Sequence, residues 1–157
     1  MKPWFQSEER RNALWIEQQR WLGTPFFAHG ESLGHAVDCV RLQHEIFVAI
    51  GALPRLQLPD YTLDHAKHST RTVLLSFLLG APALQGRFVM VPPAGKRMAG
   101  DLLALKSGRV DHHLASCTPW DEIVHAVEDV GVIRTKLDDP KIVERTLYVL
   151  RLMEVEG

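Results

Sequence analysis

A cysteine at the predicted start of an apolar helix is the first candidate for chemistry in this chain. Cys39 follows Val37 and Asp38, where a loop broken by glycines gives way to an apolar stretch. Helix starts expose unpaired backbone N–H groups and the positive end of the helix dipole, and both favour the thiolate form of cysteine. Because the thiolate is the nucleophilic form, Cys39 is the candidate nucleophile for attack on a carbonyl.

Two histidines on predicted strands could complete such a site. His113 lies in a strand predicted over 110–117, and His125 lies in the next strand, predicted over 122–127. Pairing of these two strands would bring the two imidazoles together. His113 would then take the thiol proton and pass one to the leaving amine, while His125 orients the His113 ring. The backbone N–H of Cys39 is the expected oxyanion donor.

Each of these residues also has an ordinary structural interpretation. A buried cysteine on an apolar helix stripe is more often packed than reactive, and half-buried strand histidines are common. Cys117 has no supporting motif and is interpreted as a sheet residue. His112, the rival for the role of base, would point to the opposite face of its strand if His113 points toward Cys39.

A metal site is a further alternative, because the chain has eight histidines. His29 and His35 lie close in sequence to Asp38 and Cys39, but this grouping lacks the paired-ligand spacing of a structural zinc site. We therefore expect neither a metal ion nor a cofactor. Asp38 is expected to cap the helix that begins at Cys39, a role compatible with binding a substrate amine.

The size and composition of the chain limit the classes of protein to which it can belong. Its 157 residues suffice for one domain with a proper core, and we expect a single domain over residues 1–157. The apolar share of 46%, the charged share of 24% and the formal net charge of −1 give no reason to expect a nucleic-acid partner. Two cysteines are too few for a disulfide scaffold and suit a reducing compartment.

The sequence also gives an expectation about localisation. The first residues lack the apolar core of a signal peptide, and no stretch is long enough to span a bilayer. We therefore expect synthesis and folding in the cytoplasm, without membrane insertion. Action on a cell wall would then require separate machinery for delivery.

Apolar spacing and breaker residues predict helices first and strands later. Helices are expected from the Ser7 cap to Gly23, from Cys39 to Gly51, and after Pro59 as far as Gly80, with a surface loop over 26–36. Strands are expected over 87–91, 101–106, 110–117, 122–127, 130–133 and 146–152, with a helical turn at Asp139-Pro140. This order, with short connections, predicts an α+β fold with an antiparallel sheet.

Five short segments form an ordered set of motifs. They are Trp21-Leu22-Gly23-Thr24-Pro25-Phe26, Val37-Asp38-Cys39, Gly100-Asp101-Leu102-Leu103, His113-Leu114-Ala115 and Val124-His125-Ala126. In this order they resemble the NlpC/P60 cysteine peptidases, and more closely the branch associated with bacteriophage tails. The resemblance covers the chain from about Trp15 to Leu152.

The resemblance implies a papain-like NlpC/P60 fold, with N-terminal helices packed on a mainly antiparallel sheet. It also implies a Cys39–His113–His125 triad that cleaves the stem peptides of peptidoglycan at the bond from γ-D-glutamate to the next residue. Phage tail proteins are the implied partners, and the tail or virion is the implied location.

Three residues depart from the family pattern, and all three would lie near the substrate. Phe26 stands where the family usually has a tyrosine whose hydroxyl assists at the active site. Val40 and Arg41 follow the cysteine where the family usually has serine and glycine. Phe26, Arg41 and Asp38 are the expected substrate-binding positions. The departures also leave a second function open, that of a structural or assembly component of a tail-like particle that cleaves little or nothing.

Overall fold

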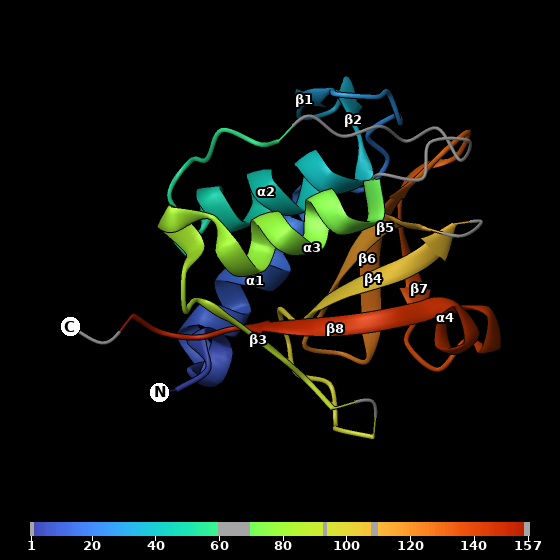
Figure 1. Ribbon diagram of the computed structural model, residues 1–157. Coiled ribbons are helices and arrows are strands. Elements are labelled where there is room, and N and C mark those ends of the chain that lie inside the picture. Colours follow the sequence, from blue (N-terminus) through green and yellow to red (C-terminus); the bar gives the residue numbers. More distant parts are fainter. Residues whose placement is uncertain (1, 60–69, 93, 108–109, 156–157) are drawn as a thin grey trace.

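The computed structural model describes residues 2–59, 70–92, 94–107 and 110–155 (Figure 1). The helices are η1 (Trp4–Gln6), α1 (Glu8–Arg20), α2 (Cys39–Ala49), α3 (Thr70–Gly80), η2 (Pro82–Leu84) and α4 (Pro140–Arg145). The strands are β1 (Glu31–Ser32), β2 (Ala36–Val37), β3 (Phe88–Met90), β4 (Leu102–Ser107), β5 (Val110–Cys117), β6 (Glu122–Val127), β7 (Gly131–Lys136) and β8 (Thr146–Leu152). The predicted order, helices first and strands later, is confirmed.

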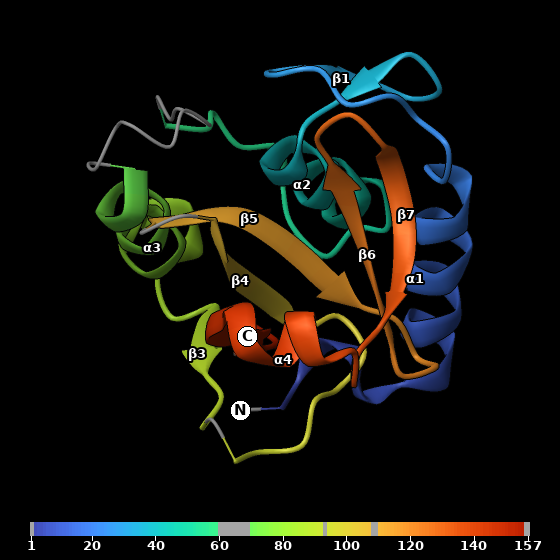
Figure 2. The same ribbon diagram turned by 90° about the vertical axis from the view of Figure 1, so that its right-hand side faces the viewer.

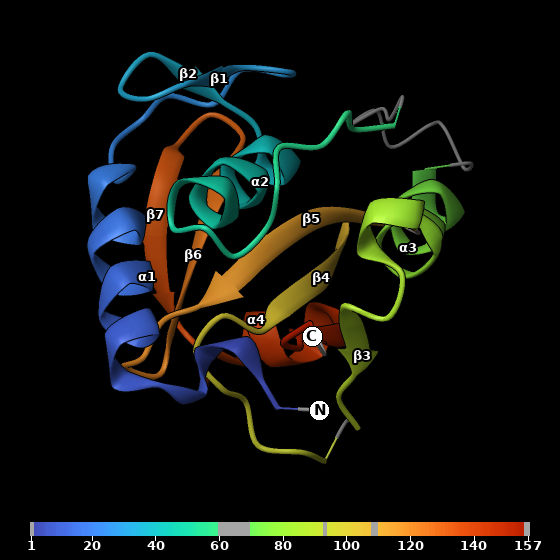
Figure 3. The same cartoon turned by 90° about the vertical axis from the view of Figure 1, so that its left-hand side faces the viewer.

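One antiparallel sheet organises the described part of the chain. Its six strands follow the order β3-β8-β4-β5-β6-β7, and each neighbouring pair is antiparallel. Strands β4 and β5 lie between α2 on one side and α4 on the other, as Figures 2 and 3 show from opposite directions. The sheet is therefore covered by helices on both faces.

Alternation along the strands divides the apolar side chains between these two faces. On β5, Leu114 packs in the larger core, which also contains Leu42 and Ile46 of α2. The next residue of the strand, Ala115, packs in a smaller core with Ile142 of α4. Because a one-residue slip would exchange the two faces, this packing sets the register of β5.

The helix starts follow the capping pattern expected from the sequence. The Ser7 side chain accepts a hydrogen bond from the backbone N–H of Arg10 at the start of α1. Asp38 is the N-cap of α2, and Gly51, just beyond its end, has a φ of +75°.

Among the helices in the described ranges, none combines the length and apolar character needed to cross a membrane.

The segment over 26–36 differs from the expected loop, because it contains most of a short hairpin. Strands β1 and β2 pair Glu31 with Val37 and Ser32 with Ala36. Each strand has two residues, too few to leave an alternating pattern in the sequence. In Figure 1 this hairpin lies above the N-terminal end of α2.

Gly100, which lies just before β4, permits a close approach that gives the first prediction. Its φ is +81°, and a Cβ there would overlap the ring of Phe5. Gly100→Ala is therefore expected to lower the free energy of unfolding by about 2–4 kcal/mol, from backbone strain and steric overlap together. Denaturant unfolding measures this loss.

Gly51→Ala is the matched control for the steric part of that effect. Gly51 has a similar φ of +75°, but a Cβ there would meet nothing within 4 Å. We expect it to lose only the strain energy of about 1–2 kcal/mol. Equal losses in the two variants would show that the contact with Phe5 adds nothing.

Candidate active site

Cys39 is held in place by the residue before it. It is the first residue of α2, and its side chain is only 2% exposed. The Oδ1 atom of Asp38 accepts hydrogen bonds from the backbone N–H groups of Val40 at 3.1 Å and Arg41 at 2.8 Å. Its Oδ2 atom accepts one from the N–H of His29 at 2.7 Å. The buried carboxylate thus fixes both the helix start and the preceding loop.

The thiol of Cys39 lies against the strand that carries His113. The backbone N–H of Leu114 donates a hydrogen bond to it, and the backbone N–H groups of Cys39 and Val40 also act on it. Leu114 directly follows His113 in β5. The helix that begins at the cysteine and the strand that carries the histidine therefore meet at this point.

The two predicted histidines are in direct contact. The Nε2 atom of His113 lies 2.7 Å from the Nδ1 atom of His125, and the ring planes are inclined at 65°. The Nε2 atom of His125 in turn lies 2.8 Å from Oγ1 of Thr135, on β7. The predicted juxtaposition of the two histidines is confirmed, whereas their catalytic roles stay a prediction.

Thr135 is a member of this cluster that the sequence did not single out. A threonine on a strand is common and carries no motif of its own. Only the pairing of β6 with β7, which sets Ile123 opposite Thr135, brings its hydroxyl beside the ring two residues farther along β6. Nothing in a single sequence specifies that register.

Burial dominates the acidity of the thiol. Burial, followed by the negative charge of Asp38, raises the pKa of Cys39 to about 12. The backbone N–H groups of Leu114, Cys39 and Val40 act in the opposite direction but are outweighed. The expectation that the helix start would make Cys39 a thiolate is therefore wrong: the local effect has the predicted sign, but desolvation is larger.

Both imidazoles are neutral near pH 7. Burial, followed by the charges of His125 and Arg145, lowers the pKa of His113 to about 3. Burial and then Arg145 lower the pKa of His125 to about 4. Neutral histidine has the bare nitrogen needed to accept a proton, but the lowered pKa makes each ring a weaker base than an exposed histidine.

These lowered pKa values predict a loss of stability in acid. Unfolded histidine has a pKa of about 6.5, so below that pH the unfolded chain binds protons that folded His113 and His125 refuse. The free energy of unfolding is expected to fall as pH drops from about 6.5 toward 4, by up to about 1.4 kcal/mol per pH unit for each histidine. Urea titrations at several pH values measure this slope.

Two histidine variants separate this effect from the general response of the chain to acid. His125→Asn should flatten the slope of the free energy of unfolding against pH between pH 6.5 and 4.5, because only one of the two histidines then binds a proton in the unfolded chain and not in the folded one. His35→Asn, at an exposed position between the hairpin strands, is the matched histidine substitution away from this pair. An unchanged slope in His125→Asn would contradict the assignment.

The predicted substrate-binding residues lie around Cys39. Phe26 is half-buried and forms a bridge with Val37, two residues before the cysteine. The guanidinium of Arg41 forms an ion pair with Glu31 of the hairpin, with Nη1 and Oε2 at 2.8 Å. Their roles in binding, like that of Asp38, stay predictions.

Two surface hollows in the described ranges bear on access to Cys39. One, of about 470 Å³, is lined by residues 25–28 and 128–131, and so includes Phe26. The other, of about 590 Å³, lies on the α4 side of the sheet and includes Trp120 and Ile142. Neither is lined by Cys39, which agrees with the burial of its side chain.

Within the described ranges, no group of three histidine, cysteine or acidic residues is placed to hold a metal ion.

Comparisons with known proteins find similarity in structure but not in sequence. No family model matches the chain, and no curated protein matches it. A lipoprotein-like protein of the NLP/P60 family from Staphylococcus aureus superposes with a TM-score of 0.63 at 17% identity, over 98% of this chain and 44% of that one. An NlpC/P60 family protein from Bacillus cereus gives a TM-score of 0.58 at 20% identity, over 88% of this chain and 39% of that one.

A third solved structure is of more similar size. The NlpC/P60 domain of the peptidoglycan hydrolase SagA gives a TM-score of 0.53 at 16% identity, over 88% of this chain and 96% of that one. The chain thus spans less than half the length of the first two structures. At these identities the comparisons establish the fold, and the predicted papain-like NlpC/P60 architecture is confirmed.

Proposed function

We propose that this chain, which has the fold of the NlpC/P60 proteins, is a cysteine peptidase that cleaves the stem peptides of peptidoglycan. The observation that carries the proposal is the meeting of three groups from separate elements. The Cys39 thiol lies against the backbone of Leu114, and the adjacent His113 contacts His125 at 2.7 Å. The description of SagA as a peptidoglycan hydrolase supports the class of substrate.

In the proposed reaction the Cys39 sulfur attacks the peptide carbonyl as its proton moves to His113. The backbone N–H of Cys39 donates to the developing oxyanion. His113 then gives its proton to the leaving amine, and the C–N bond breaks to leave a thioester on Cys39. A water molecule, deprotonated by His113, hydrolyses the thioester and restores the thiol.

The raised pKa of Cys39 affects the first of these steps. A thiolate that formed before the substrate arrived would be a buried charge, and the pKa of about 12 shows how strongly burial opposes it. Proton transfer to neighbouring His113 replaces this lone charge with a close ion pair between the Cys39 thiolate and protonated His113. We therefore propose that ionisation and attack are coupled in the bound complex.

The finer parts of the proposal come from the motif resemblance. The bond is the one that follows γ-D-glutamate, and residues 1–157 act as one catalytic domain. Cytoplasmic synthesis is followed by delivery to the cell wall by a tail-like particle, whose proteins are the partners. Each of these can fail while the peptidase proposal stands.

Mass spectrometry of digested muropeptides tests the activity and the bond together. Purified chain is incubated with disaccharide-tetrapeptide fragments, and the products are expected to carry one added water at the bond after γ-D-glutamate. The same incubation with the Cys39→Ala variant is the control. Absence of products from every stem peptide tried would refute the proposal.

A second candidate function is favoured by the closed state of the thiol. A structural component of a tail-like particle would keep the fold without needing an accessible nucleophile, and Cys39 is buried. Acid quenching of the chain with a stem peptide, followed by mass spectrometry of the intact protein, separates the two. A thioester on Cys39 that is absent from His113→Ala supports the peptidase, whereas no thioester in either supports the structural role.

A further inference from the structure

A row of three polar side chains crosses three adjacent strands and begins one residue before Leu114, whose backbone N–H meets the Cys39 thiol. His113 on β5, His125 on β6 and Thr135 on β7 are joined by contacts of 2.7 Å and 2.8 Å. The middle ring is only 5% exposed, and both of its nitrogens are engaged. A flip of the His125 ring would therefore break two contacts at once.

Two arrangements of protons fit these contacts, because a neutral imidazole has one N–H donor and one acceptor nitrogen. In the first, Nε2–H of His125 donates to Oγ1 of Thr135, and Nδ1 of His125 accepts from Nε2–H of His113. In the second, every hydrogen bond is reversed, and the Thr135 hydroxyl donates to His125. Only the first leaves Nδ1 of His113 without a proton.

The proton on His113 decides whether this residue can act on the thiol. Its Nε2 atom is engaged by His125, so Nδ1 is the nitrogen that remains for exchange with Cys39. A bare Nδ1 can accept the thiol proton, whereas an N–H there cannot. The sulfur already accepts a hydrogen bond from the N–H of Leu114. Its own proton therefore favours a bare Nδ1 of His113, which can accept it, over an Nδ1–H, which would be a second donor.

We propose that Thr135 is a positioning residue: its hydroxyl accepts from Nε2–H of His125, which stabilises the tautomer that the Cys39 thiol selects and so keeps Nδ1 of His113 ready as the base. The consequence for catalysis rests on the proposed peptidase function, but the tautomers exist and can be measured without any substrate. The role of Thr135 is thus indirect: its hydroxyl contacts His125, and His125 contacts His113.

Thr135→Val tests this inference with little change in shape. The buried Nε2–H of His125 would lose its acceptor, which costs more than a bare ring nitrogen without a donor, so the tautomer with the proton on Nδ1 becomes favoured. That proton would be donated to Nε2 of His113 and would move the His113 proton to Nδ1. We expect kcat for peptide cleavage to fall about 10- to 100-fold with KM little changed, as for other residues that orient a reacting histidine.

Nitrogen-15 NMR of the histidine rings gives a readout that a merely structural role would not move. In the unmodified chain we expect protonated Nε2 and bare Nδ1 on both histidines. Thr135→Ser keeps the hydroxyl and should keep this pattern and the activity, whereas Thr135→Val should place the His125 proton on Nδ1. If Thr135→Val does not fold, the spectra of the unmodified chain and of Thr135→Ser still decide the tautomer.

The results also separate this inference from the proposed function. An Nδ1–H signal for His125 in the unmodified chain would overturn it, and so would an unchanged spectrum in Thr135→Val. The expected tautomers in a chain that cleaves no stem peptide would support the positioning role of Thr135 and refute the peptidase proposal. Full activity in Thr135→Val would overturn the catalytic consequence.

Discussion

Replacing Cys39 with alanine is expected to reduce the cleavage of peptidoglycan stem peptides by at least about 10³-fold. Alanine has no thiol and cannot form the thioester, so the proposed covalent route is closed. The variant should fold, because the side chain is small and its removal from the start of α2 leaves the Asp38 cap intact. Product release from a defined muropeptide, followed by chromatography, measures the loss.

Cys117→Ala is the matched control for that experiment. Cys117 is also 2% exposed, and burial raises the pKa of its thiol as well. Its partners are different, since it packs with Leu103 and Ile123 in the smaller core. We expect activity within about threefold of the unmodified chain and a stability loss of about 1 kcal/mol. Cleavage that persisted in Cys39→Ala would exclude Cys39 as the nucleophile. Its disappearance in Cys117→Ala as well would show that removal of either buried thiol is enough to stop the reaction.

Replacing Asp101 with alanine is expected to cause a large loss of stability, about 3–5 kcal/mol. The Asp101 carboxylate is fully buried, and it accepts hydrogen bonds from Nε of Arg151 at 2.9 Å and Nη2 of Arg151 at 2.8 Å. It also accepts one from the backbone N–H of Met98 at 2.8 Å. Alanine would leave both the guanidinium and the N–H without this acceptor.

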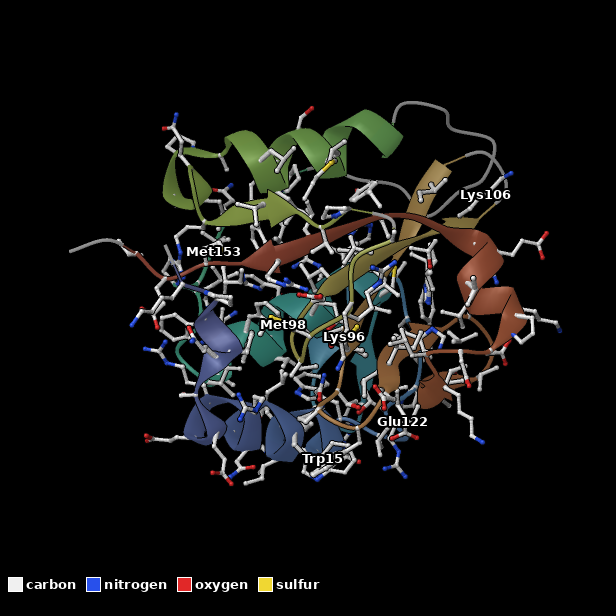
Figure 4. The ribbon with its side chains drawn as sticks, turned by 90° about the horizontal axis from the view of Figure 1, so that it is seen from below. Trp15, Lys96, Met98, Lys106, Glu122 and Met153 are labelled. Atoms are coloured by element: carbon white, nitrogen blue, oxygen red, sulfur yellow. The ribbon has the colours of Figure 1, made fainter. Side chains whose placement is uncertain are left out.

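The same carboxylate anchors the loop that leads into β4. Figure 4 labels Lys96 and Met98 in this loop, and Arg151 also donates to the backbone oxygen of Lys96. Denaturant unfolding measures the stability loss. As a control, Glu154→Ala removes an exposed ion pair with Arg10 and should cost less than about 1 kcal/mol. Losses of similar size in the two variants would contradict the special role of Asp101.

Local signals in the sequence predicted those elements whose causes are local. Capping depends on one side chain and the next few N–H groups, so Ser7 and Asp38 located the starts of α1 and α2. The strands over 110–117, 122–127 and 146–152 were located to the residue because turn residues or a short helix flank them. The hairpin β1–β2 was missed because its pairing depends on the fold around it.

In the candidate site, too, the features with local causes were predicted and those that depend on packing between elements were not. Alternation along a strand gives each residue a face, and this was enough to predict that His113 and His125 meet. The depth at which Cys39 is buried depends on how α2 packs against β5, and that packing decides its pKa. Thr135 could not be found, because its partnership requires the register of a third strand.

The place of β8 in the sheet has a consequence for how the protein is made. This strand is the last of the described strands to leave the ribosome, yet it lies between β3 and β4. While synthesis proceeds, β4 can pair with β5, but its other edge stays open and β3 has no neighbour. Open strand edges invite pairing with other chains. The nascent protein therefore passes through a stage that is prone to aggregation, and this stage ends when residues 146–152 emerge and join the two parts of the sheet.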